Sequence, residues 1–142
     1  MRPVGFFREM NSGPSASSFP SIHDHLETGE QYPADQVAGY LRSGHPVLDI
    51  MDITRDVVNG SFVVPGGSSL LTDGLHVWRT DLSFYVASYA IELPASFLTF
   101  VREQDFRVPS VQHNVLVPVA AAARQWLGFR MDKGAAPRRS SE

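Results

Sequence analysis

The chain has 142 residues, a length that fits one domain with a buried core. It contains no cysteine, which excludes disulfides, a cysteine nucleophile and thiolate metal sites. The net charge is −3, and residues 1–132 carry −5 (nine Arg against fourteen Asp and Glu), which argues against nucleic acid as the main ligand.

Compartment and topology are indicated mainly by what the sequence lacks. The opening MRPVGFFREM has no apolar run typical of a secretory signal, and no stretch approaches the roughly eighteen apolar residues of a membrane span. The lack of cysteine fits a reducing compartment. We therefore expect a cytoplasmic protein that does not enter a membrane.

Two early segments are predicted to be helical. Ser21 suits the cap of a short helical turn over 21–27, after a loop over 11–20 rich in Ser, Gly and Pro. A longer helix is predicted from Pro33 to Ser43, because proline suits a first turn and Gly44 suits the stop. Its buried stripe should contain Val37, Tyr40 and Leu41.

Residues 45–59 fit two structures. Apolar residues at 47, 48 and 50 suit the start of a strand, whereas those at 48, 51, 53, 57 and 58 also fit a helix. We expect a short strand or extended segment, then a helix from about residue 50 to residue 58. The next apolar run, 62–64, ends at Pro65-Gly66-Gly67.

The strongest local signal is a β-hairpin around Asp73-Gly74. Apolar runs at 69–71 and 75–78 flank this pair, which suits a type I′ turn with positive φ at both central residues. Alternation places His76 and Trp78 on one face of the second strand and Leu75 and Val77 on the other. One face is expected in the core, and the other is expected to be exposed or in contact with a partner.

Three helices are predicted after the hairpin. Thr80 should cap the first, with Asp81 in its opening turn, and Pro94 should open the second. Pro118 should open the third, which reaches Leu127. The inward residues of the first two are predicted to be Leu82, Tyr85, Val86, Tyr89, Phe97, Leu98, Val101 and, as a further candidate, Phe100.

Together these elements predict an α+β fold, in which a small antiparallel sheet built on the hairpin packs against several short helices. We expect an α+β core domain over 1–108, a C-terminal segment with a helix over 109–130, and a disordered tail over 131–142.

An acidic triplet is the main candidate for chemistry. On a helix, Asp49, Asp52 and Asp56 would share one face, where they could bind a metal or form a general acid–base pair. The alternative is the solvated side of an amphipathic helix. An enzyme or small-ligand binder would add His76 and Asp81 around a pocket.

Other catalytic and ligand-binding motifs are absent or weak. The histidines show no zinc-site spacing, the loop 65–69 lacks the phosphate-loop sequence, and there is no nucleophile elbow. His23 and His25 could offer two metal ligands, but a surface turn is the simpler interpretation. Most aromatic residues of the segment 68–106 have helical spacing, which favours the core over a binding surface. No cofactor or metal is expected.

The chain contains the pattern TDGxxxWxxDLxxYxxxYxxxLPxxFLxxxR, from Thr72 to Arg102. In this pattern and in its opening RPVGFFRE it resembles small single-domain bacterial proteins, mostly actinobacterial, with no established activity; the resemblance covers 1–10 and 33–108. That group is similar in type to the immunity proteins of polymorphic-toxin systems, which are small, cytosolic, acidic α+β domains. The resemblance implies protein binding and transfers no site residue.

We therefore expect a non-enzymatic protein-binding domain of the immunity type, which inhibits a basic protein toxin. The expected partner-binding residues are His76, Trp78, Asp52, Asp56 and Arg79. Two alternatives stay open: a small-ligand binder or enzyme that uses the acidic triplet, and a homodimer or larger homo-oligomer with Trp78 or the C-terminal helix at its interface. Nucleic acid and membrane are not expected partners.

Overall fold

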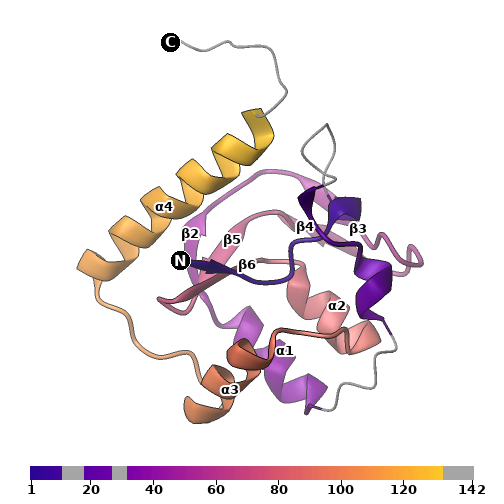
Figure 1. Cartoon of the computed structure of the whole chain (residues 1–142), viewed down its shortest axis with the longest axis horizontal. Helices are drawn as coiled ribbons and strands as arrows, with labels where there is room; N and C mark the ends of the chain where they lie inside the picture. Colours follow the sequence, from indigo (N-terminus) through magenta and orange to yellow (C-terminus); the bar gives the residue numbers. More distant parts are fainter. Residues whose placement is uncertain (11–17, 27–31, 133–142) are drawn as a thin grey trace.

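The computed structural model describes residues 1–10, 18–26 and 32–132. Its strands, α-helices and 3₁₀ turns (η) run in the order β1 (Arg2–Pro3), η1 (Arg8–Met10), η3 (Ile22–His25), α1 (Ala34–Arg42), β2 (His45–Leu48), β3 (Ile53–Arg55), β4 (Val63–Pro65), β5 (Leu70–Thr72), β6 (His76–Arg79), α2 (Leu82–Tyr89), α3 (Ala95–Glu103) and α4 (His113–Asp132). The α+β fold class is confirmed (Figure 1). Within the described ranges, no helix is both long enough and apolar enough to span a membrane.

Four strands form the main sheet, in the order β1-β6-β5-β2. β5 is antiparallel to both neighbours, whereas the short β1 runs parallel to β6. The β5–β6 hairpin was predicted, but its turn is not type I′: Gly74 has a φ of 101°, and Asp73 is not among the described residues with positive φ. The Asp73 carboxylate instead accepts hydrogen bonds from the backbone N–H groups of Leu75 (2.9 Å) and His76 (2.7 Å).

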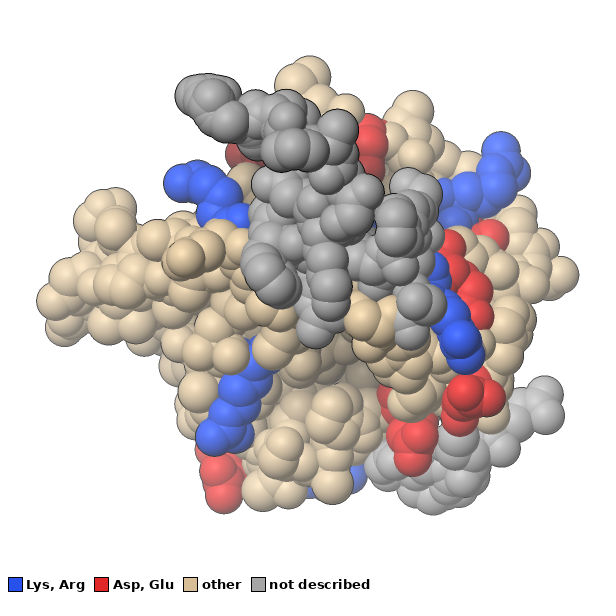
Figure 2. All heavy atoms as spheres, turned by 45° about the horizontal axis from the view of Figure 1, so that its top comes forward, with Lys and Arg blue, Asp and Glu red and all other residues tan. Residues whose placement is uncertain are grey.

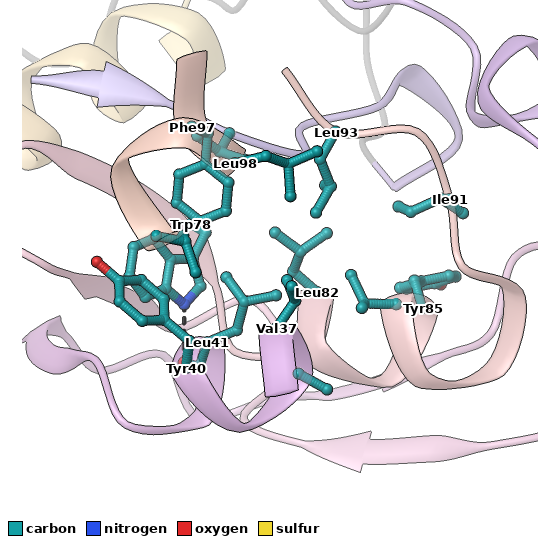
Figure 3. Close-up of a cluster of buried hydrophobic side chains, with 14 of the residues drawn as sticks. Val37, Tyr40, Leu41, Trp78, Leu82, Tyr85, Ile91, Leu93, Phe97 and Leu98 are labelled. Atoms are coloured by element: carbon teal, nitrogen blue, oxygen red, sulfur yellow. Dashed lines mark hydrogen bonds between the residues drawn. The ribbon is translucent and has the colours of Figure 1, made fainter. Parts of the chain in front are cut away.

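Helices cover both faces of the main sheet. On one face, α1, α2 and α3 enclose the larger core, where the Trp78 indole N–H donates to the Leu41 carbonyl at 2.9 Å (Figure 3). On the other face, α4 and the N-terminal segment close a second core, which includes Val77, Leu70 and Ala123. Successive residues of β6 point into different cores, and all four are buried. The prediction of an exposed face on β6 is wrong, because α4 covers the second face of the sheet.

The predicted helical segments before residue 108 are present, except for the one over 50–58. Ser21 caps η3, as predicted, by accepting a hydrogen bond from the His23 N–H. Thr80 does not cap α2: its hydroxyl donates to the Ser69 carbonyl at 3.1 Å, and Asp81 takes the cap position. Most predicted inward residues of α1, α2 and α3 are buried: Val37, Tyr40, Leu41, Leu82, Tyr85, Val86, Phe97, Leu98 and Val101. Tyr89 and Phe100 are only partly buried.

The C-terminal helix is longer than predicted. α4 begins at His113, so Pro118 lies inside the helix and does not open it. The helix continues through Met131 and Asp132, which were assigned to the tail; residues 133–142 lie outside the described residues, as do 11–17 of the predicted loop. The division of the chain at residue 108 stays a prediction.

The predicted helix over 50–58 is wrong. This segment contains β3, which pairs with β4 in a separate two-stranded antiparallel sheet. Thr54 and its partner Val64 lie on the inner face, where the Thr54 hydroxyl donates to the Asp81 carboxylate at 3.0 Å. These contacts with β4 and Asp81 exist only in the folded chain, and they outweigh the local helical spacing.

Candidate protein-binding surface

Four of the five residues predicted to bind a partner are interior residues. His76, Trp78 and Arg79 are 2%, 0% and 6% exposed, and Asp56 is 4% exposed. They do not form a contact surface in this fold. Of the five, Asp52 alone is partly exposed.

His76 belongs to a buried polar network centred on Asp73. The Asp73 carboxylate accepts a hydrogen bond from the Tyr40 hydroxyl at 2.8 Å, and it lies 3.0 Å from His76 Nδ1. Burial raises the pKa of Asp73, but the bonds from His76, from the backbone and from Tyr40 together hold that pKa below its ordinary value. The network ties the turn of the hairpin to α1, which gives His76 a structural role.

Arg79 and Asp81 form a buried bidentate ion pair. The Arg79 Nε and Nη2 atoms donate to the two Asp81 carboxylate oxygens at 3.0 Å and 2.9 Å. Arg79 Nη1 also donates to the Met10 carbonyl at 3.3 Å, and Asp81 accepts the bond from Thr54. The pair therefore fastens the N-terminal segment and β3 to β6.

The acidic triplet is not one site. Asp49 is exposed, Asp52 accepts a bond from the Ser68 hydroxyl at 2.5 Å, and Asp56 is buried elsewhere. Within the described ranges, no group of three or more His, Asp and Glu side chains is arranged to hold a metal ion. The prediction that the three aspartates share a helix face is wrong, because the segment is a strand and two loops.

The β3–β4 hairpin exposes apolar side chains on its outer face. Met51 is fully exposed, and Ile53 and Val63 are 72% and 47% exposed. The strand register places Ile53 opposite Pro65 and Arg55 opposite Val63 on this same face. We call these five residues (Met51, Ile53, Arg55, Val63 and Pro65) the hairpin face.

Carboxylates lie at one end of the hairpin face. Asp49 and Asp52, together with Met51, Ile53 and Pro65, line an open depression of about 940 Å³. Within the described structure, the Oδ1 atom of Asp52 is buried without a hydrogen-bond partner. Apolar side chains beside carboxylates suit a protein surface that carries both apolar and basic groups.

In Figure 1 the β3–β4 hairpin lies toward the right of the view, and α4 runs along the upper left. Residues 113–123 of α4 contain no Lys, Arg, Asp or Glu, and the projecting end of the molecule at the left of Figure 2 shows none of these side chains. Charged side chains of both signs are interspersed toward the right of the same view. Residues 113–123 of α4 therefore contribute no charged side chain to the surface, whereas the hairpin face has Asp49 and Asp52 beside it.

The sequence contains a signal for this face. Ile53 and Arg55 alternate with Thr54, and Val63 and Pro65 alternate with Val64, which is the period of two that marks a strand. The loop 65–69 is a turn, as interpreted: the Ser69 N–H donates to the Gly66 carbonyl at 3.0 Å. Each alternating run is only three residues long, too short to outweigh the helical spacing around it.

Comparisons with known proteins give no functional assignment. No protein family matches the chain, and neither a curated protein nor a solved structure is significantly similar to it. Function is therefore inferred from the geometry of the described residues.

Proposed function

We propose that this chain is a non-enzymatic protein-binding domain and that the hairpin face is its contact surface. The observation that supports the proposal is the exposure of Met51, Ile53 and Val63 beside the exposed Asp49 and the partly buried Asp52. Soluble proteins usually expose large apolar side chains singly, and a group of them marks an interaction site. Burial of each such side chain contributes about 1.5–3 kcal/mol before the costs of association.

The proposed partner is a basic protein. Residues 1–132 carry a net charge of −5, which attracts a basic surface over a distance and speeds the encounter. Within this class we propose an immunity-type role in the cytoplasm, in which the domain covers and inhibits a basic toxin such as a nuclease. The acidic charge and the resemblance carried by residues 72–102 support this narrower proposal.

Ile53→Glu tests the hairpin face. The side chain is 72% exposed, so the fold should persist, while the new charge stands in the middle of the apolar group. A partner captured by the tagged wild-type chain should bind the variant at least about tenfold more weakly, by calorimetry. Val117→Glu is the matched control, because Val117 is 52% exposed on α4. Equal binding by wild type and Ile53→Glu, or equal loss in both variants, would contradict the proposal.

Growth assays test the immunity role separately. A toxin-like protein encoded beside this chain should arrest growth, co-expression of the wild-type chain should restore growth, and Ile53→Glu should not. Growth restored equally by Ile53→Glu would reject the immunity role of this surface. Light scattering should show a monomer, and a stable dimer would favour the homo-oligomer alternative instead.

A further inference from the structure

A second cavity lies apart from the hairpin face, between the N-terminal segment, η3, the start of α3 and the later part of α4. Its volume is about 590 Å³, and its lining includes Phe6, Phe19, Trp126, His25 and Glu92. This volume lies in the range of small-molecule sites, which are mostly apolar with a few well-placed polar groups. The cavity contains none of the residues of the hairpin face.

Aromatic rings form one wall of the cavity. Phe6 meets the Trp126 indole edge to face with ring centroids 4.9 Å apart, and Phe19 meets the same indole at 6.0 Å. Phe6 and Phe19 belong to the second core, and Trp126 packs against it, so core packing holds these rings in place. Such rings offer a flat apolar surface to a ligand.

His25 and Glu92 form the polar end of the cavity. The backbone N–H of Glu92 donates to the His25 carbonyl at 2.8 Å, which holds the two residues side by side. His25 Nδ1 lies 3.1 Å from the Ser21 carbonyl oxygen. A carbonyl only accepts hydrogen bonds, so Nδ1 must carry the hydrogen, and Nε2 of the neutral imidazole is an acceptor.

When His25 is neutral, two hydrogen-bond acceptors therefore face each other in this cavity. Nε2 of His25 lies 3.9 Å from Oε1 of Glu92, which is beyond hydrogen-bond distance. A nitrogen donor placed beside the pair can reach both atoms, and a positive charge on that donor strengthens both bonds. The Glu92 carboxylate disfavours an anion in the same position.

We propose that this cavity binds an organic cation, in which an ammonium or guanidinium group is joined to an apolar body. The N–H donors lie beside His25 Nε2 and the Glu92 carboxylate and point at both, and the apolar body lies against the aromatic wall. This chemistry is shared by small amines and by Lys or Arg side chains of a polypeptide. The proposal is independent of protein binding at the hairpin face.

NMR titration of the full chain tests the proposal with two built-in reporters. The chain has two indole N–H groups: Trp126 lines the cavity, and Trp78 is buried and bonded to Leu41. Phenethylammonium should shift the Trp126 signal saturably and leave the Trp78 signal in place; Trp126→Phe assigns the signals. 3-Phenylpropionate has a similar body and the opposite charge, so it should produce no saturable shift.

Glu92→Gln should weaken phenethylammonium binding by about tenfold, because the amide keeps the shape and removes the charge. Glu103→Gln in the exposed part of α3 is the control and should bind as the wild type does. A lysine derivative blocked at its α-amino and carboxyl groups distinguishes the polypeptide source: binding of this probe alone assigns the cavity to a lysine side chain. Equal binding of 3-phenylpropionate, unchanged affinity in Glu92→Gln, or no shift of Trp126 with either cation would overturn the proposal.

Discussion

Asp56→Asn should destabilise the protein by an amount that depends on pH. Asp56 is 4% exposed, and its carboxylate accepts bonds from the N–H groups of Val58 (2.8 Å) and Ser61 (3.1 Å). The hydroxyls of Ser61 and Tyr89 also donate to it. Burial raises the pKa of Asp56, but these four bonds outweigh it and lower the pKa from 3.8 to about 2.

This shift of pKa sets the expected magnitude and its sign. The pKa of Asp56 is just under two units lower in the folded chain than in the unfolded chain. This pKa difference corresponds to about 2 kcal/mol of folding free energy. Because the pKa of the folded state is the lower one, the stabilisation is fully present above about pH 4 and is lost as the pH falls toward about 2. Asparagine has no charge at any pH, so the wild type should exceed the variant by about 2 kcal/mol at neutral pH, apart from a constant offset for amide geometry.

Urea unfolding measures the effect. The free energies of unfolding of wild type and Asp56→Asn are compared at neutral pH and at lower pH values for as long as both proteins fold. The difference should narrow as the pH falls below about 4. Asp24→Asn, in the exposed part of η3, is the control and should change little at any pH. A difference that stays constant across the range would refute the assignment of the stabilisation to the carboxylate charge.

Two further substitutions test how the β3–β4 hairpin is attached. Gly67→Ala should lower the free energy of unfolding by about 1–3 kcal/mol, because the new Cβ would lie 1.8 Å from the Thr54 Oγ1. Adding Thr54→Ala to this variant should recover part of the loss. If the two losses measured by urea unfolding simply add, the clash is contradicted. Asp81→Asn should cost about 3–5 kcal/mol in thermal unfolding, because it leaves the buried Arg79 guanidinium without a carboxylate. A loss no larger than that of an exposed aspartate would show that the ion pair contributes little.

Local signals predicted those parts of the fold that depend on neighbouring residues. Gly44 and Pro33 bound α1, and Asp73-Gly74 marks the β5–β6 turn, since caps and turns are decided within a few residues. Even there the turn type was wrong, because the Asp73 carboxylate accepts the backbone bonds that a type I′ turn does not need. Local signals therefore predicted the positions of these elements correctly but not the type of the turn.

Local signals failed where a distant segment decides the structure. The segment around Asp52 and Asp56 has helical spacing, but β4 supplies the pairing that makes it a strand. Likewise, alternation along β6 correctly separated His76 and Trp78 from Val77, but it did not reveal that α4 covers the second face of the sheet. The predicted surface residues were therefore placed in the interior.

The sequence predicted only part of the candidate binding surface. Asp52 was predicted, whereas Met51, Ile53 and Val63 were assigned to a helix or to a short apolar run with no role. The sequence alone does not show that an isoleucine will be exposed, because exposure depends on which elements pack over that residue. The cavity beside Trp126 joins residues from both ends of the chain, and no spacing in the sequence brings Phe6 and Trp126 together.

By itself, the sequence determined the α+β class, the central hairpin, the positions of three short helices and the lack of cysteine chemistry. These follow from turn residues, caps and the period of apolar positions, all of which act over a few residues. The tertiary structure decided that β3 is a strand, that β6 is buried on both faces, and which apolar side chains remain exposed. These outcomes depend on contacts between residues far apart in the chain, because burial and strand pairing are properties of the partners that a segment meets.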